Sequence, residues 1–314
     1  MAPRRRFEDL VTERTNPAGR GLDRMTPLQI AQLMNREDRH AVAAVRRQAR
    51  AIVEAVELIA VALARGGRLV FVGAGTSGRL GVLEAAECPP TFGTAPRTVQ
   101  AIMAGGPASV FRSREGAEDD VEAARRAVRA RVRRGDVVAG ISASGATPFV
   151  AAALGEARRR GAATVLVACN PDARGRRGGA QRSVDVVIAP APGPEVLAGS
   201  TRLKAGTATK LVLNTLTLAS MARLGKIYSN RMIDLQPRSA KLRDRARRLV
   251  RDLGQVQPAR AAALLRAAGG SVRIAIVMAR RGLSAAAAAR ALHEAAGSLG
   301  NVLQGSGKVL HRRR

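Results

Sequence analysis

The sequence predicts an α/β fold, a parallel-sheet αβα sandwich, followed by a small C-terminal helical bundle. Short apolar runs bounded by glycine, such as "RLVFVG" (68–73) and "DVVAGI" (136–141), alternate with stretches of helical periodicity. Buried strands that alternate with helices are typical of a parallel sheet, because the crossover helices cover both of its faces. The 314 residues suffice for one such domain and a smaller second one.

Three regions are expected along the chain. Residues 1–40 should form an irregular arm and a capped helix over 26–38, and residues 41–236 the sheet domain. Residues 237–314 should form the small helical domain, from four short helical segments and a basic tail at 311–314. The remaining expected elements are a long helix over 41–65, strands within 98–106, 162–170 and 183–190, a loop over 173–182 and a long apolar helix over 205–224.

The formal net charge of +29 raises the possibility of nucleic-acid binding. Nearly all the positive charge is arginine, with only five lysines, and it is scattered along helical stretches such as "ARRAVRARVRR" (124–134). One Tyr, five Phe and no Trp leave few platforms on which bases could stack. These features argue against a specific nucleic-acid partner, although non-specific adsorption to polyanions is expected.

The two cysteines, Cys88 and Cys169, are far apart and show no CxxC or zinc-ligand spacing. This usage is typical of a reduced, cytoplasmic protein. The N-terminal "PRRRF" is not followed by an apolar segment, so it is interpreted as a basic tail rather than an export signal. No apolar run approaches the roughly 18 residues of a membrane span, so no membrane partner is expected.

Gly73, Gly75 and Gly78 match the GxGxxG pattern of dinucleotide-binding turns. That use requires an acidic residue at the end of the next strand, to bind the ribose. The expected strand "TVQAIMAGG" (98–106) offers none, and no Gly-Lys-Ser/Thr follows the glycines to make a Walker loop. The pattern therefore does not favour a nucleotide cofactor.

Two hydroxyl-rich turns each follow a strand and precede a helix. The first contains Thr76, Ser77 and Gly78, and the second, "SASGAT", contains Ser142, Ser144, Gly145 and Thr147. A helix N-terminus offers unpaired N–H groups and a positive dipole end to an anion. Two such turns at the carboxyl ends of parallel strands should converge on one crevice that fits a phosphorylated small molecule. The alternative is that both are ordinary helix caps.

Carboxylates are scarce, with 24 in the chain, so clusters of them are candidates for a functional role. Glu87 precedes Cys88-Pro89-Pro90, where the helix is expected to stop because proline has no N–H to donate. The C-terminus of a helix is an unfavourable place for a carboxylate, which favours a proton-carrying role. Glu118 is a second candidate, in competition with Glu115, Asp119 and Asp120; a solvated surface is the alternative for all of them.

The three histidines, His40, His293 and His311, are dispersed along the chain. No sequence-local metal cluster is therefore expected, and Ser-His-Asp hydrolysis is disfavoured. Proton transfer by carboxylates remains as the expected chemistry.

The chain resembles the N-acetylmuramic acid 6-phosphate etherases, which contain the sugar isomerase (SIS) phosphosugar-binding fold. The resemblance runs from about Thr12 to Gly300. "GAGTSGR" (73–79) and "SASGAT" (142–147) indicate the SIS fold alone, whereas "ECPPTFG" (87–93), "EGAEDD" (115–120) and "GPEVLAGSTRLK" (193–204) are more specific to the etherases.

The resemblance implies cleavage of the ether between C3 of the sugar and D-lactate by elimination and then hydration, without a metal or cofactor. It implies that Glu87 is the acid and Glu118 the base. The 6-phosphate would be held by Ser77, Ser142, Ser144 and Thr147. A homodimer with sites near its interface is implied too, with the helix over 41–65 as an interface element.

Arg202 and Lys204 are hypothesised to neutralise the lactyl carboxylate, with a structural ion pair to Glu195 or another carboxylate as the equal alternative. Thr209 departs from the family, which usually has glutamine there.

The rival function is a non-catalytic sugar-phosphate sensor like glucokinase regulatory protein. Such sensors resemble two tandem SIS domains, whereas "GTSGR" and "SASGAT" each occur once here. A transcription regulator would need an N-terminal helix-turn-helix, and residues 1–26 are too irregular for one. A sugar-phosphate isomerase lacks the etherase-specific segments.

Overall fold

The computed structural model describes residues 10–171, 184–235 and 239–304. The chain divides into two compact units: Met1–Ala86 with Pro96–Thr217, and Glu87–Ala95 with Leu218–Arg314. The expected boundary at 236–237, the expected loop at 173–182 and both basic tails lie outside the described residues.

The first unit is built on a five-stranded sheet in which every neighbouring pair of strands is parallel. Its order is β2-β1-β3-β4-β5. The strands are β1 (Leu69–Gly73), β2 (Val99–Met103), β3 (Val137–Ile141), β4 (Ala163–Val167) and β5 (Val186–Ile188). All five residues of β1 and of β3 are buried, as expected for central strands covered on both faces. The predicted fold class is confirmed.

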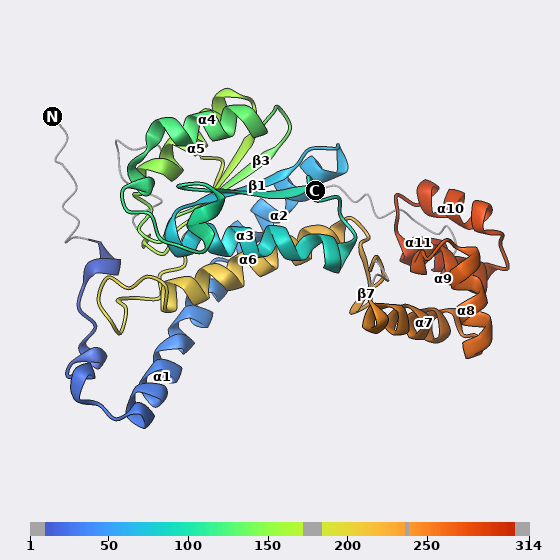
Figure 1. Cartoon of the computed structure of the whole chain (residues 1–314), viewed down its shortest axis with the longest axis horizontal. Helices are drawn as coiled ribbons and strands as arrows, with labels where there is room; N and C mark the ends of the chain where they lie inside the picture. Colours follow the sequence, from blue (N-terminus) through green and yellow to red (C-terminus); the bar gives the residue numbers. More distant parts are fainter. Residues whose placement is uncertain (1–9, 172–183, 236–238, 305–314) are drawn as a thin grey trace. The chain divides into compact units, whose positions relative to one another are not determined.

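Helices cover both faces of this sheet (Figure 1). On one face, Val70 and Val138 pack in a cluster that includes Val128 of α4 and Phe149 of α5. On the other face, α3 approaches so closely that a Cβ on Gly81 would lie 2.8 Å from Cβ of Phe71. The helices of this unit are α1 (Pro27–Arg46), α2 (Ala49–Ala64), α3 (Gly75–Phe92), α4 (Val121–Arg131), α5 (Pro148–Arg159) and α6 (Lys204–Arg223); α3 and α6 continue into the second unit.

The first two helices differ from the prediction. The capped start at Thr26 is confirmed as a capping box with Gln29, but α1 runs to Arg46. The break falls at 47–48, not near 40, and the expected single helix over 41–65 is therefore wrong. Gln48 sits at the break, and its side-chain oxygen accepts the N–H of Ala189 beyond β5, at 3.2 Å. A contact 141 residues away thus helps to fix the break.

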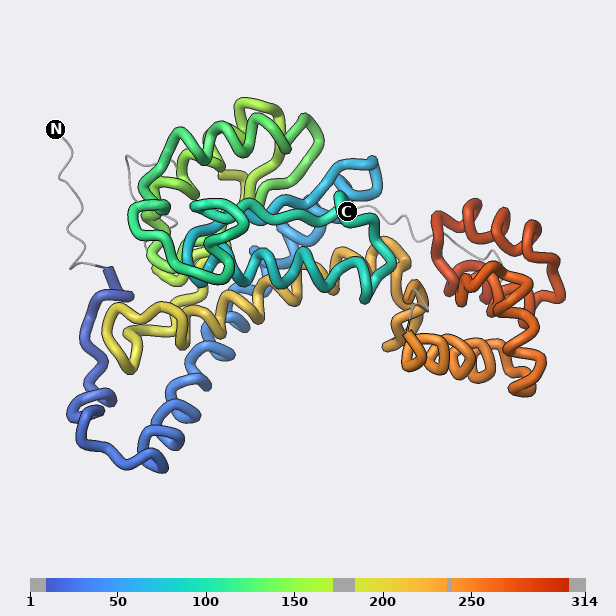
Figure 2. The backbone as a smooth tube through the Cα atoms, in the orientation of Figure 1, coloured from blue at the N-terminus to red at the C-terminus, as the bar shows by residue number. Residues whose placement is uncertain are grey.

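The N-terminal arm lies beside the segment that leads into α6 (Figure 2). Nδ2 of Asn16 donates to the carbonyl of Pro194 at 3.0 Å, and the N–H of Gly199 donates to the carbonyl of Thr12 at 3.2 Å. The arm is therefore ordered by hydrogen bonds to a distant part of the chain, although its sequence is irregular.

The second unit is helical around its own core. Ser239, Ser271 and Ser284 cap three of its helices by accepting backbone N–H bonds. Its core includes Val250 and Ile276, both fully buried. The elements are β6 (Ile227–Tyr228), β7 (Arg231–Met232), α7 (Ala240–Gly254), α8 (Pro258–Ala267), α9 (Val272–Arg281), α10 (Ala285–Glu294) and α11 (Leu299–Gln304). The predicted helical bundle is confirmed; α11 and the β6–β7 pair had not been predicted.

Candidate active site

The carboxyl ends of β2, β1 and β3 meet at one edge of the sheet. Gly73, the last residue of β1, is in register with Met103 of β2 and Ile141 of β3. The chain passes from β1 to β2 on one side and returns to β3 on the other, which makes β1/β3 the switch point of the topology. Ligands of doubly wound sheets bind outside such a point, in the crevice between the two strand ends.

The turn after β1 is shorter than expected. Ala74 alone separates β1 from α3, so Thr76 and Ser77 lie in the first turn of a helix rather than in a loop. The short turn depends on glycine: a Cβ on Gly78 would lie 2.5 Å from the carbonyl oxygen of Gly73. The hydroxyls are thereby held at a helix N-terminus, where an anion is favoured.

The turn after β3 contains a network of hydroxyls. Oγ of Ser142, which is buried, lies 2.8 Å from Oγ1 of Thr147 and 3.5 Å from Oγ of Ser144. Gly145 has φ +70°, a conformation that side chains other than glycine rarely adopt. Thr147 makes no side-chain capping bond to α5, so the alternative of an ordinary cap does not account for its hydroxyl.

Glu118, the predicted base, follows β2 on the short 3₁₀ helix η6 (Ala117–Asp119). It is exposed, and it lines a cavity of about 120 Å³ that Ala74 and Gly75 also line. The structure therefore brings Glu118 to the same edge as the first turn. Its neighbour Asp120 is the N-cap of α4, accepting the N–H of Ala123 at 2.8 Å.

Glu87, the predicted acid, is exposed on α3 but does not end that helix. The helix continues through Pro89 and Pro90 to Phe92, so the expectation that it stops before Cys88 is wrong. Proline fixes φ near the helical value, and its cost is the missing N–H at each position. The argument from the negative dipole end therefore does not apply to Glu87, and its role as the acid stays a prediction.

Lys204 is engaged in an ion pair within the chain. It is 2% exposed, and its Nζ donates to Oε2 of Glu37 in α1. Burial raises the pKa of Glu37, but the hydrogen bonds from Lys204 and Asn16, together with the nearby positive charge of Lys204, lower it, and the net pKa is lowered. This geometry is the structural alternative given for Lys204, with Glu37 in place of Glu195.

Glu195 instead caps α6, accepting the backbone N–H groups of Lys204 and Ala205 at 2.9 Å each. Burial raises its pKa, although these two bonds act in the opposite direction. Arg202 precedes the helix and is exposed, and no side chain or carbonyl of the described residues pairs with its guanidinium. The N-terminus of α6 is thus occupied by Glu195, while Arg202 stays available.

Cys169 is excluded as a nucleophile. Its thiol is buried, and burial raises its pKa to about 12. A thiol with such a pKa stays protonated near neutral pH. Its Sγ lies 3.7 Å from Oγ1 of Thr209, the position that departs from the family. Thr209 therefore contacts the core rather than the cluster of hydroxyls.

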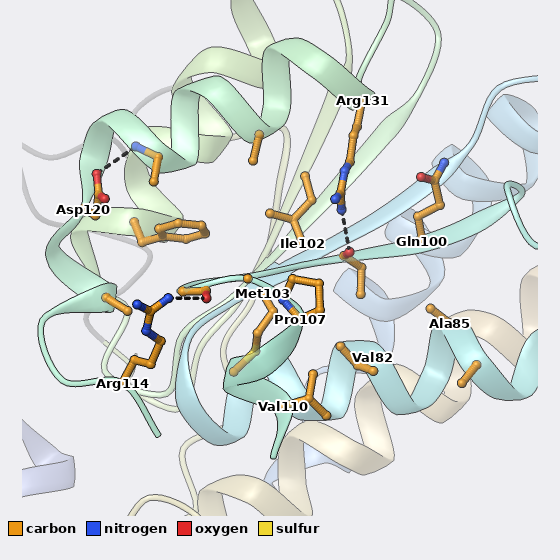
Figure 3. Close-up of a pocket in the computed structure, with 18 of the residues that line it drawn as sticks. Val82, Ala85, Gln100, Ile102, Met103, Pro107, Val110, Arg114, Asp120 and Arg131 are labelled. Carbon is orange, nitrogen blue, oxygen red and sulfur yellow. Dashed lines mark hydrogen bonds between the residues drawn. The ribbon is translucent and has the colours of Figure 1, made fainter. Parts of the chain in front are cut away.

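Sequence reasoning missed a groove of about 880 Å³ along the edge strand β2 (Figure 3). Val82 and Ala85 of α3 line one side, and Ala127 and Arg131 of α4 line the other. Arg131 donates to the carbonyl of Ala101 in β2 at 3.3 Å. The groove is visible only in the fold, because its lining comes from segments far apart in the sequence.

Known proteins resemble this chain over most of its length. The family described as glucokinase regulatory protein N-terminal SIS domain matches residues 51–158. An N-acetylmuramic acid 6-phosphate etherase from Synechococcus elongatus is 49% identical, covering 92% of this chain and 93% of the relative. One from Gloeobacter violaceus is 50% identical with the same coverage, and one from Symbiobacterium thermophilum is 50% identical over 85% of this chain and 88% of the relative.

The chain belongs to the N-acetylmuramic acid 6-phosphate etherase family. The family resemblance that "ECPPTFG", "EGAEDD" and "GPEVLAGSTRLK" indicate is confirmed. No single helix in the described part of this etherase-family chain is long and apolar enough to cross a membrane.

Three residues that the sequence reasoning did not single out, Arg79, Ser109 and Arg114, line the same cavity as Glu118. Arg79 stands directly after the quoted glycines, but only the fold shows that it reaches the segment after β2. There its Nε donates to the carbonyl of Val110 at 2.8 Å.

Proposed function

We propose that the protein cleaves the D-lactyl ether of N-acetylmuramic acid 6-phosphate, giving N-acetylglucosamine 6-phosphate and D-lactate. The observation that carries this proposal is the similarity, at 49–50% identity over most of both chains, to proteins of that name. The sheet edge supports it, since Glu118 and two hydroxyl-rich turns lie at the carboxyl ends of the strands, where doubly wound sheets bind their ligands. The reaction would place the enzyme among the carbon–oxygen lyases and serve the breakdown or recycling of cell-wall amino sugars.

The proposed mechanism is an elimination followed by a hydration. Ring opening exposes an aldehyde at C1, which acidifies the proton on C2. Glu118 takes that proton, the C3–O bond breaks with its electrons on lactate, and Glu87 donates a proton to the leaving oxygen. Water then adds across the C2–C3 double bond, with its hydroxyl on C3 and a proton on C2. Each proton transfer of this kind contributes a rate factor of roughly 10² to 10⁴.

The proposed role of the turns is to hold the 6-phosphate. Ser77 and Thr76 offer hydroxyls at the start of α3, and Ser142, Ser144 and Thr147 offer them after β3. Phosphate oxygens can accept from hydroxyls and from helix N-terminal N–H groups together. Holding the phosphate in this way would fix the position of the substrate relative to the glutamates.

The test is proton NMR of the protein with the substrate in D₂O. Free lactate, with deuterium at C2 of the sugar product, is the expected result. Glu87→Gln should still exchange the C2 proton of the recovered substrate while releasing lactate far more slowly. Glu118→Gln should neither exchange the C2 proton nor release lactate. Asp119→Asn is the matched control and should keep both activities. Exchange that survives in Glu118→Gln would show that another group is the base.

A second candidate is a non-catalytic phosphosugar sensor, which the match to a glucokinase regulatory protein domain favours. The same experiment separates the two, because a sensor would bind the substrate without releasing lactate.

We also propose that the protein is a cytoplasmic homodimer. Light scattering during size-exclusion chromatography should give twice the monomer mass.

A further inference from the structure

The cavity beside Glu118 is lined by two arginines, Arg79 of α3 and Arg114 of the segment after β2. It adjoins the groove along β2, whose lining also includes Arg114, drawn in Figure 3. The cavity is small, about 120 Å³, and two hydroxyl side chains, Ser109 and Ser113, line it too. It is therefore rich in hydrogen-bond donors.

Neither arginine is neutralised by a carboxylate. Among the described residues, no Asp or Glu oxygen lies within ion-pair distance of either guanidinium. Arg79 donates instead to the carbonyl of Ser109 (2.9 Å) and to Oγ of Ser113 (3.3 Å), and Arg114 donates to the carbonyl of Gly105 (3.2 Å). These bonds orient the guanidiniums but leave their charge uncompensated, and each retains further N–H groups.

Ser109 gives an independent indication of a ligand. The residue is 2% exposed, and its Oγ has no hydrogen-bond partner in the part of the chain that the structure describes. The hydroxyl is tightly enclosed, because a Cβ on Gly105 would lie 2.3 Å from it. A buried hydroxyl without a partner is unfavourable, and an acceptor atom of a ligand in the cavity would satisfy it.

We propose that this cavity binds the carboxylate of the D-lactyl group, with Arg114, Arg79 and Ser109 as its donors. The proposal rests on the proposed function. Glu118 takes the proton from C2, so the group bound beside it is close to C2 and C3. The lactyl carboxylate is fewer bonds from C2 than the 6-phosphate is, and it is the anion that this position favours.

The charge arrangement gives a reason for such a subsite. Glu115 and Glu118 also line the cavity, and Glu118 must be ionised to act as a base. A substrate carboxylate placed beside an ionised glutamate would be repelled unless cations stood between them. Two guanidiniums provide that compensation here. Lys204, which sequence reasoning offered for this task, is already paired with Glu37.

The test compares two substrates: N-acetylmuramic acid 6-phosphate and its methyl amide, in which a neutral amide replaces the lactyl carboxylate. The wild type should prefer the acid. Arg114→Gln should lower kcat/KM for the acid by about tenfold to a hundredfold, the range of charge-assisted hydrogen bonds, and leave the amide almost unchanged. Ser109→Ala should act in the same direction without lowering Tm, because the hydroxyl it removes has no partner. Arg112→Gln, exposed and outside the cavity lining, is the matched control.

Inhibition by the two products distinguishes the possible anions. D-lactate should inhibit Arg114→Gln more weakly than the wild type, whereas N-acetylglucosamine 6-phosphate should inhibit both equally. If Arg114→Gln instead selectively loses inhibition by N-acetylglucosamine 6-phosphate, the cavity holds the phosphate and the proposal is overturned. The proposal is also overturned if Arg114→Gln lowers kcat/KM equally for the acid and the amide. If the wild type releases no lactate, the proposed function fails, and binding of D-lactate by NMR to the wild type and Arg114→Gln still decides the subsite.

Discussion

Lys204, at the start of α6, and Glu37, in α1, form a buried ion pair across 167 residues of sequence. Nδ2 of Asn16 donates to the same Glu37 oxygen at 2.6 Å. One carboxylate thus joins the N-terminal arm, the first helix and the helix that follows the segment 193–203. Because the lysine and the glutamate are both enclosed, either partner alone would be a buried, uncompensated charge.

Lys204→Met should therefore destabilise the protein by about 3 kcal/mol, because it leaves the buried carboxylate of Glu37 without its ion-pair partner. Urea unfolding followed by circular dichroism measures the change. The double variant Glu37→Met/Lys204→Met should recover much of the loss, since no charge is left unpaired. A single variant of normal stability whose KM for the acid substrate rises would instead assign Lys204 to substrate binding.

Glu37 should contribute a stability that depends on pH. Its pKa in the folded chain is lowered from the ordinary value of 4.5. Stability from such a group is complete above 4.5 and is lost as the pH falls through the folded-state pKa. Urea unfolding between neutral and acidic pH gives the free energy of unfolding of the wild type and of Glu37→Gln. The difference between the two free energies should narrow below pH 4.5. A difference that stays constant with pH would contradict the lowered pKa.

Gly78→Ala should disrupt the junction between β1 and α3. The added Cβ would lie 2.3 Å from Sδ of Met103 and 2.5 Å from the carbonyl oxygen of Gly73, so backbone would have to move. We expect a loss of about 1–3 kcal/mol, typical of overpacking. Gly155→Ala in α5 is the matched control, because its Cβ would meet nothing within 4 Å. It should stabilise the helix by roughly 0.5–1 kcal/mol. Equal stabilities of the two variants would show that the junction has room.

Ser142→Ala should weaken binding of the phosphosugar. Its Oγ is the centre of the hydroxyl network, with Thr147 and Ser144 on either side. We expect KM to rise by about tenfold or more, the equivalent of one charge-assisted hydrogen bond. Thr215→Ala removes an exposed hydroxyl of α6 that donates to the carbonyl of Leu211 in the same helix, and it should leave KM unchanged. An unchanged KM in Ser142→Ala would place the phosphate elsewhere.

The sheet could be predicted from the sequence because its signals are local. Leu69–Gly73 and Val137–Ile141 are buried on both faces, so each appears as a short apolar run that glycines bound. Parallel pairing then brings the two hydroxyl-rich turns to one edge, as predicted, because β1 and β3 are neighbours.

The features that could not be predicted depend on distant partners. The break between α1 and α2 is held by Gln48 with Ala189, and neither residue signals the other. The helix α3 continues through Pro89 and Pro90, and Gly93 just after it lies against the carbonyl of Asp234, where a Cβ would be 2.4 Å away. Arg79 and Ser109 acquired their proposed role only once the fold placed both on one cavity.

The single residue between β1 and α3 has a consequence for how this protein can change by insertion and deletion. Each residue of a helix turns it by about 100°. One residue added at Ala74 would swing the hydroxyl of Ser77 away from the sheet edge and turn Arg79 away from Val110. Length variation among natural homologues should therefore be nearly absent at 73–79.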